Sequence, residues 1–304
     1  MKADRKRGCM YGLAIGDAMG APVEFHKRGT FEPVTGYRSG GKFGLDAGEW
    51  TDDTAMALCL AQSIIDSMGF DPVDQMEKFL SWMEEGYMSC TGKPIGMGKI
   101  IMRTLIRYRR TRQPYTDICH EKFSGNGSLM RLAPVVVYYA DDLDRAVYYA
   151  ALSSKTTHAS PIAVDACRFM AYVIVHLLQG ASKQEIFTDA FRKGVVEYFE
   201  DAPLHESLLP VINGDFRVKC SNAIPSSGYV IHSLEAALWS FYYTDTFEEA
   251  ILKAVNLGED ADTVGAITGQ LAGACYGLEN IPHQWIQELK QTKLIVTVLD
   301  ELLK

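Results

Sequence analysis

Apolar side chains recur with helical spacing along most of the chain. The run from Asp53 to Ile65 is typical, because Ala, Leu, Met and Gln dominate it and these residues favour helices. We predict about a dozen helices, over 5–20, 52–68, 72–84, 95–110, 127–140, 143–154, 161–179, 183–200, 229–243, 247–255, 262–277 and 284–303. Residues 23–50 are instead polar and glycine-rich, which is typical of a functional loop. No Pro/Gly/Ser linker divides the chain, so we expect an all-α fold in a single compact domain over 1–304.

Two of the predicted helices carry glycine at every fourth position. The two series are Gly8, Gly12, Gly16 and Gly20, and Gly265, Gly269, Gly273 and Gly277. Each interior glycine costs a helix up to about 1 kcal/mol relative to alanine, so a close backbone contact is needed in compensation. A membrane dimer motif is the alternative, but Asp17, Gln270 and the short apolar lengths argue against it. We therefore predict that both helices are buried and are neighbours.

Composition and charge exclude several classes of protein. The chain is 47% hydrophobic with a net charge of -8, and basic residues concentrate only over 103–112, so a nucleic-acid partner is not expected. The seven cysteines form no CxxC pair, which argues against a disulfide framework or zinc and favours a reducing, cytoplasmic location. The longest apolar stretch, 161–178, is interrupted by Asp165 and Arg168, so no membrane span is expected. No signal-peptide core follows the basic N-terminus.

Two acid-rich turns precede predicted helices. They contain Thr51, Asp52 and Asp53 in the first turn, and Asp260, Asp262 and Thr263 in the second. Helix capping is one explanation of such residues. If the turns meet, however, their carboxylates repel one another unless cations neutralise them. Magnesium and manganese prefer oxygen ligands of this kind, and the absence of His and Cys argues against zinc. The second turn fails as an EF-hand because Val264 and Leu271 replace oxygen ligands.

Other segments have the composition of a ligand cradle. Gly96 and Gly98 lead into one predicted helix, and Ser124, Gly125, Asn126 and Gly127 lead into another. Backbone N–H groups at such a helix start can bind phosphate, although glycine turns also occur without a ligand. His158 stands just before a further helix, where it has either a structural or a functional role. P-loop, Rossmann, zincin and α/β-hydrolase motifs are absent from the sequence.

Five segments in this order resemble the ADP-ribosylglycohydrolase family over nearly the whole chain. They are Gly12–Phe25, Trp50–Thr54, Gly125–Arg131, Thr157–Ser160 and Asp260–Thr263. The resemblance implies an all-α domain with two divalent cations, Mg²⁺ or Mn²⁺. It places them on Thr51, Asp52, Asp53, Asp260, Asp262 and Thr263. The implied activity is metal-dependent hydrolysis of the N-glycosidic bond that joins ADP-ribose to arginine on a protein.

The same resemblance implies roles for individual residues. The distal ribose would lie over the metal ions, and His158 would lie near the adenosine ribose. The diphosphate would be held by Gly96, Gly98, Ser124 and Gly125, and Asn126 and Gly127 are further substrate-binding candidates. Tyr229 is a candidate wall for adenine, or a structural tyrosine. The catalytic candidates are Glu24, Asp53 and Asp262, with an aspartate preferred as the base and Glu24 as acid or positioner of water.

The identity of the bond that is cleaved stays open. Nitrogenase-regulating family members carry an Asp-Ile-Gly sequence where this chain has Pro94, Ile95 and Gly96. Linkages to arginine, serine, acetate and nucleic-acid bases all occur among substrates of the family. A noncatalytic ADP-ribose binder and a hydrolase of small ADP-ribose conjugates are therefore alternatives to a monomeric enzyme that acts on ADP-ribosylated protein.

Overall fold

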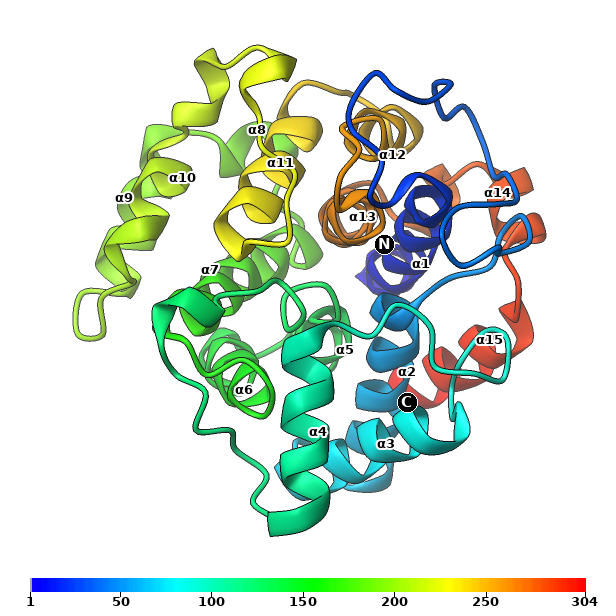
Figure 1. Ribbon diagram of the computed structural model, residues 1–304. Coiled ribbons are helices and arrows are strands. Elements are labelled where there is room, and N and C mark those ends of the chain that lie inside the picture. The colour runs from blue at the N-terminus through cyan, green and yellow to red at the C-terminus, as the bar shows by residue number, and fades with distance from the viewer. Residues whose placement is uncertain (1) are drawn as a thin grey trace.

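The computed structural model describes residues 2–304, and these residues form helices and loops with no strand. The helices are α1 (Lys2–Gly20), α2 (Asp52–Asp66), α3 (Pro72–Glu85), α4 (Lys99–Thr111), α5 (Ala133–Tyr138), α6 (Leu143–Lys155), α7 (Pro161–Leu178), α8 (Lys183–Ile186), α9 (Asp189–Tyr198), α10 (Leu209–Asn213), α11 (Val230–Tyr242), α12 (Phe247–Val255), α13 (Ala261–Tyr276), α14 (His283–Glu288) and α15 (Thr292–Leu302). They pack into one domain (Figure 1), and the predicted all-α class is confirmed.

Several predicted helices are shorter or divided. The helix expected over 183–200 is two helices, because the Thr188 hydroxyl accepts a hydrogen bond from the Phe191 N–H and so starts α9. The helix expected over 284–303 breaks where Gln291 adopts a left-handed backbone, with φ 54°. The segment before α5 forms turns rather than helix, so α5 begins at Ala133 instead of 127. Helix α10 was not predicted.

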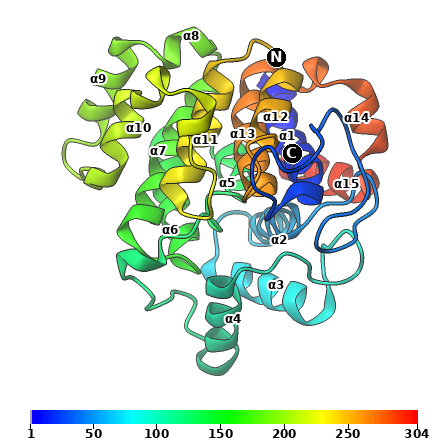
Figure 2. The ribbon, with the colours of Figure 1, turned by 45° about the horizontal axis from the view of Figure 1, so that its top comes forward.

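The two glycine series pack against each other, as predicted. Helices α1 and α13 lie side by side at the centre of the molecule (Figures 1 and 2) and run antiparallel. A Cβ atom added to Gly12 would lie 2.0 Å from the Gly269 carbonyl oxygen, and one added to Gly20 would lie 2.3 Å from that of Ala261. Such distances bring the two backbones into direct contact, which only glycine permits.

The other helices surround this pair. Helices α2, α5, α7, α11 and α12 contact it. Helix α7 has the length and the mean hydropathy, 1.5, of a membrane span, but 78% of it is buried inside the protein, where it is a core helix.

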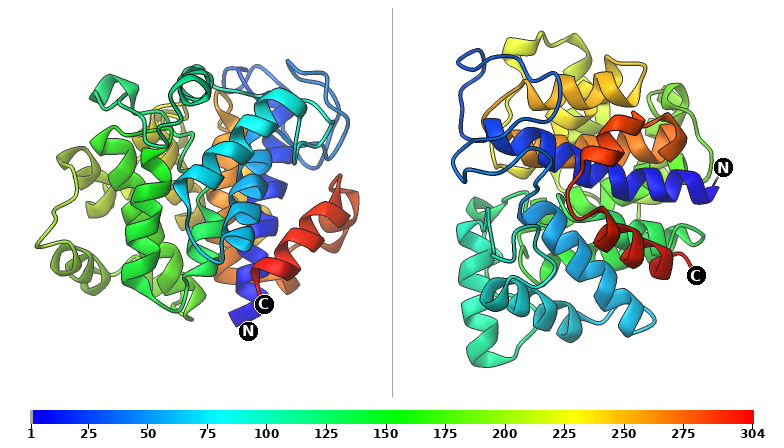
Figure 3. Two further views of the ribbon diagram at one scale, coloured as in Figure 1. Left: turned by 90° about the horizontal axis from the view of Figure 1, so that it is seen from below. Right: turned by 90° about the vertical axis from the view of Figure 1, so that its right-hand side faces the viewer.

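The start of α1 and the end of α15 lie on the same side of the molecule (Figure 3), and Arg7 and Asp300 form an ion pair there at 2.6 Å. All seven cysteines are unpaired.

The glycine contact positions the acid-rich turns. Because α1 and α13 are antiparallel, the end of α1 at Gly20 lies beside the start of α13 at Ala261. Asp17, one turn earlier in α1, accepts hydrogen bonds from the first turn of α2. Helix α1 therefore aligns the starts of two helices that are more than two hundred residues apart in the sequence.

Candidate active site

The structure brings the two acid-rich turns together. Carboxylate oxygens of Asp17, Asp53 and Asp262 lie within 4.8 Å of one another, and so do those of Glu24, Asp260 and Asp262. Asp262 belongs to both groups, so it joins them. The cluster combines residues from the end of α1, the following loop and the starts of α2 and α13.

Asp17 fixes the first turn from outside. Its carboxylate accepts hydrogen bonds from the backbone N–H and the hydroxyl of Thr51, and from the same two groups of Thr54, at 2.6–3.1 Å. The side chain of Thr51 therefore does not cap its own helix, and neither does that of Asp260 at the start of α13. Helix capping by the turns' own first residues does not explain the acidic cluster, because Asp17 performs that function for α2.

The cluster holds several carboxyl groups close together in the protein interior, which makes their ionised forms unfavourable. Burial, with repulsion from Asp260 and Asp52, raises the pKa of Glu24 to about 8. Burial and repulsion from Asp17 raise the pKa of Asp52 to about 8 and that of Asp53 well above its usual range. Burial together with Glu24 has the same effect on the pKa of Asp262. Each carboxylate is thus costly to ionise where it stands.

Two oxygens of the cluster are buried without any hydrogen-bond partner. They are Oε2 of Glu24 and Oδ1 of Asp53. Unsatisfied buried carboxylate oxygens are unfavourable unless a cation or a ligand occupies the space beside them. The donor set is made only of oxygen, with no His or Cys among the clustered groups. These residues therefore fit hard divalent cations such as Mg²⁺ and Mn²⁺.

A cavity of about 490 Å³ opens beside the cluster. The predicted site residues that line it are Glu24, Asp52, Asp53, Gly96, Gly98, Gly125, Asn126, Gly127, His158, Asp260, Asp262 and Thr263. A Cβ atom on Gly96 would lie 2.1 Å from Oδ1 of Asp52, and one on Gly127 would lie 2.7 Å from the His158 ring. The glycines are therefore required for the cavity walls to lie this close together.

Three predicted site residues do not line the cavity. The Ser124 hydroxyl donates to the Glu121 carbonyl at 2.5 Å and contacts the Ser160 hydroxyl, so it faces the protein. The Tyr229 ring packs edge-on against His232, and its neighbour Gly228 lines the cavity instead. Thr51 is turned toward Asp17, although a hydroxyl that donates its proton keeps lone pairs free for a cation.

The side chain of Asn126 hydrogen-bonds to the carboxylate cluster instead of pointing into the cavity. Its amide nitrogen donates to Oδ2 of Asp260 at 2.5 Å and to the Ser233 hydroxyl at 2.7 Å. The second cradle therefore fixes the orientation of one carboxylate of the second acid-rich turn.

His158 is held as a neutral hydrogen-bond donor. Buried Arg131 donates to the Thr157 hydroxyl at 2.6 Å and to the Gly127 carbonyl at 2.6 Å. Because Arg131 only donates, Nδ1 of His158, 2.9 Å away, is the only acceptor that the Thr157 hydroxyl reaches among residues 2–304; we therefore assign the hydroxyl proton to that contact and the ring proton to Nε2. Burial and the charge of Arg131 lower the pKa of His158 to about 3. Nε2 lies beside the backbone of Gly125 and Gly127, at the cavity wall.

The long loop supplies an aromatic rim. Phe25, Lys42 and Phe43 line the cavity beside Glu24. Phe25 is 58% exposed and has a left-handed backbone, with φ 67°, which is costly for a residue with a bulky side chain.

Sequence reasoning gave no role to Asp17, Arg131 or the rim residues. Asp17 is the lone charged residue between Gly12 and Gly20, and this isolation within a helix predicted to be buried was a usable signal. Arg131 ends one of the segments that resemble the family, but its contact with Thr157, 26 residues away, is recognised only once the fold is known.

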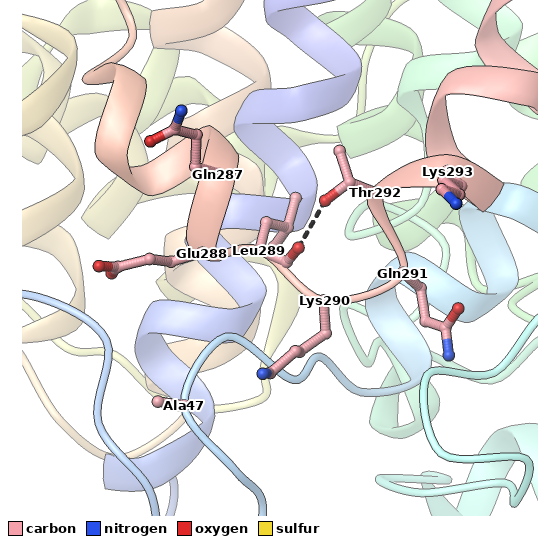
Figure 4. A pocket seen from close by; sticks show the side chains of 8 residues that line it. All are labelled: Ala47, Gln287, Glu288, Leu289, Lys290, Gln291, Thr292 and Lys293. Carbon is pink, nitrogen blue, oxygen red and sulfur yellow. Dashed lines mark hydrogen bonds between the residues drawn. The ribbon is translucent and has the colours of Figure 1, made fainter.

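A second concavity, of about 480 Å³, lies at the turn that connects α14 to α15 (Figure 4). It is lined by Ala47 and residues 287–293. Its one drawn hydrogen bond, from the Thr292 hydroxyl to the Leu289 carbonyl at 2.5 Å, is local turn chemistry. None of the clustered carboxylates lines it, so the cavity beside the acid-rich turns is the candidate active site.

Comparison with known proteins shows the family of the chain. The family model described as ADP-ribosylglycohydrolase matches residues 1–304. The chain is 36% identical to ADP-ribosylarginine hydrolase Tri1 of Serratia proteamaculans, over 98% of this chain and 79% of that protein. It is 31% identical to ADP-ribosyl-[dinitrogen reductase] glycohydrolase of Rhodospirillum rubrum, over 94% and 90% of the two chains. A solved structure titled ADP-ribosylglycohydrolase-related protein complex superposes with a TM-score of 0.85 and 40% identity, covering 99% of this chain and 98% of that one. The protein therefore belongs to the ADP-ribosylglycohydrolase family of enzymes.

Proposed function

We propose that this protein is a divalent-cation-dependent hydrolase that releases ADP-ribose from modified arginine side chains of proteins. The observation that carries the proposal is the group of buried carboxylates, two of whose oxygens lack any partner, at one wall of a cavity whose other walls are glycine loops. The relative from Serratia proteamaculans is named ADP-ribosylarginine hydrolase, which supports the same linkage here.

The residues that would hold the two cations are Thr51, Asp52, Asp53, Asp260, Asp262 and Thr263, with Glu24 beside them. Bound Mg²⁺ or Mn²⁺ would neutralise the carboxylates, orient ribose hydroxyls and make a water molecule more acidic. The glycine loops leave room beside Gly96, Gly125 and Gly127, where we place the diphosphate against backbone N–H groups.

The reaction replaces the bond from the anomeric carbon to nitrogen with a bond to the oxygen of water. Positive charge develops on the ribose ring in the transition state, and the nearby carboxylates of Asp53 and Asp262 stabilise it. One proton leaves the water and one joins the departing guanidine. We assign the first proton to a carboxylate oxygen of Asp53 that is not bound to a cation, and the second to Glu24, whose carboxyl group lies in the same cluster and has an unpartnered Oε2.

The test is a panel of substrates with arginine, serine and acetyl linkages, each assayed with Mg²⁺, with Mn²⁺ and with a chelator. We expect free ADP-ribose from an arginine-modified protein, and only when a divalent cation is present. Binding of ADP-ribose without turnover would support a noncatalytic binder, and turnover confined to O-acetyl-ADP-ribose would support a hydrolase of small conjugates. Full turnover after complete demetallation would contradict cation dependence.

Replacing Thr157 by valine tests the orientation of His158. The variant removes the hydroxyl that links Arg131 to Nδ1 of His158, so the imidazole loses its fixed tautomer. We expect KM to rise about tenfold with kcat nearly unchanged, because a hydrogen bond to substrate contributes about 0.5–1.5 kcal/mol. The nitrogen chemical shifts of His158 should show the proton on Nε2 in the wild-type protein and a mixture of tautomers in the variant. Thr157→Ser keeps the hydroxyl, so its KM and the nitrogen chemical shifts of its His158 should match those of the wild type. If the wild-type ring carried its proton on Nδ1, the assigned orientation of His158 would be wrong.

A further inference from the structure

We propose that Phe25 and Phe43 form a subsite for the cationic guanidinium of the leaving arginine, and that Lys42 occupies this subsite while the protein is free. The inference rests on the proposed function, because it specifies which leaving group the same cavity accepts. It goes further by assigning the linkage preference to three residues of the long loop.

The rim stands next to the reacting groups. Phe25 directly follows Glu24, and its backbone N–H donates to the Glu259 carbonyl at 2.6 Å, beside the second acid-rich turn. This contact holds the residue in the left-handed conformation, with φ 67°. The ring is thereby kept at the cavity although it is 58% exposed to solvent. A ring held in this way loses exposed surface when a ligand fills the space beside it.

The rim already binds a cation. The Lys42 ammonium lies 4.0 Å from the centroid of the Phe25 ring and 5.6 Å from that of Phe43. The two rings meet edge to face, with centroids 6.4 Å apart. Lys42 takes part in none of the ion pairs or side-chain hydrogen bonds found among residues 2–304, apart from these ring contacts. The aromatic pair is thus a cation site occupied by a movable side chain.

The position of the rim matches that of a leaving group. The glycine loops proposed for the diphosphate contact Asp52 and His158, whereas Glu24 and Phe25 adjoin Asp262 and Glu259. In Figure 1 the blue loop of residues 23–50 lies above the centre of the molecule, and the cyan and green chain leading into α4 lies below it. With ADP-ribose extending from the acid cluster toward the glycine loops, the group bonded to the anomeric carbon faces the rim.

The chemistry of the rim favours arginine over other linkages. A guanidinium is planar and weakly hydrated, so it stacks on an aromatic face better than an ammonium does. Serine and acetyl leaving groups carry neither a positive charge nor an extended planar cation, so they gain no cation–π energy there. An entering guanidinium must displace Lys42, and Lys42 therefore competes with arginine-linked substrates in particular.

The experiment compares two small substrates, ADP-ribosylated agmatine and O-acetyl-ADP-ribose, in the cation-loaded protein. Phe25→Leu keeps an apolar side chain but removes the ring. It should lower kcat/KM for the agmatine conjugate about tenfold and change that for the acetyl conjugate less than about twofold, as expected for loss of a cation–π contact. Phe43→Leu should act in the same direction. Lys42→Met should lower KM for the agmatine conjugate only.

Matched controls are available elsewhere on the surface. Lys253 lies 5.1 Å from the Trp239 ring, and Tyr148 is 60% exposed on α6; neither lines the cavity. Lys253→Met and Tyr148→Leu should leave both activities at the wild-type value. Melting curves of all variants show whether the fold is kept.

A binding measurement separates this inference from the proposed function. Calorimetry with agmatine, at saturating ADP-ribose, should show binding that weakens in Phe25→Leu and strengthens in Lys42→Met. Equal loss of both activities in Phe25→Leu, no change in any rim variant, or no agmatine binding by the wild-type protein would overturn the subsite even if arginine-linked ADP-ribose is hydrolysed. Failure to hydrolyse any arginine-linked substrate, with agmatine binding intact, would instead overturn the proposed function alone.

Discussion

Replacement of Gly269 by alanine is expected to unfold the protein. The added methyl group would lie 1.9 Å from the Gly12 carbonyl oxygen and 2.3 Å from its carbonyl carbon. Both atoms belong to the backbone of α1, so no side-chain rotation relieves the clash, and the two helices must separate along their whole contact. We expect a loss of about 4 kcal/mol or more in the free energy of unfolding, a large fraction of the total for a protein domain.

Gly194 provides the matched control within a helix. A methyl group there, on α9, would meet only the hydroxyl of Tyr172 at 3.2 Å, the far end of a flexible side chain. Gly194→Ala should therefore be neutral or slightly stabilising, because alanine favours helices over glycine by about 1 kcal/mol. Denaturant unfolding of both variants, followed by circular dichroism, gives the comparison. A Gly269→Ala protein as stable as the wild type would show that α1 and α13 are not in backbone contact.

The same contact shows what the sequence could predict about the fold. Glycine at every fourth position destabilises an isolated helix. Two helices that both carry such a series therefore predict close packing of one backbone against the other. Their antiparallel direction, with Gly12 beside Gly269, follows from the whole fold and was not readable from spacing. The ends of some helices were predicted wrongly for a different reason. The break at Gln291 depends on one left-handed residue that is not glycine, and such a conformation leaves no signal in the pattern of apolar positions.

The candidate site was predictable to a similar depth. The residue types in the two acid-rich turns indicate oxygen ligands for a hard cation, whatever their arrangement in space. Side-chain direction was not predictable. The ring of Tyr229 turns toward His232, and the hydroxyl of Ser124 toward Glu121, because neighbours distant in the sequence offer partners there. Asp17 was missed because its hydrogen bonds cross 34–37 residues of chain.

Replacement of Asp262 by asparagine is expected to slow turnover strongly and at the same time to stabilise the metal-free protein. Asp262 belongs to both groups of carboxylates, so the change removes a cation ligand and also a buried carboxyl group that burial, Glu24 and Asp53 make costly to ionise. We expect kcat to fall by about 10²- to 10³-fold, the usual cost of losing one electrostatic contact to a transition state. The melting temperature of the chelator-treated variant should exceed that of the chelator-treated wild type.

The pH dependence of stability gives an independent check of this argument. The pKa values of Glu24 and Asp52 are raised from 4.5 and 3.8 to about 8 in the folded protein. A raised pKa in the folded state contributes stability that is fully present below about pH 4 and is lost as the pH rises through about 8. Chelator-treated wild type should therefore have a lower melting temperature at pH 8 than at pH 6. Added Mn²⁺ or Mg²⁺ should remove most of this difference. The difference should also be smaller in chelator-treated Asp262→Asn. Exposed Asp201 is the control, because Asp201→Asn leaves the cluster intact and should behave as wild type. If the chelator-treated protein were equally stable at both pH values, neither burial nor mutual repulsion would make these carboxyl groups costly to ionise, and their need for cations would lose its physical basis.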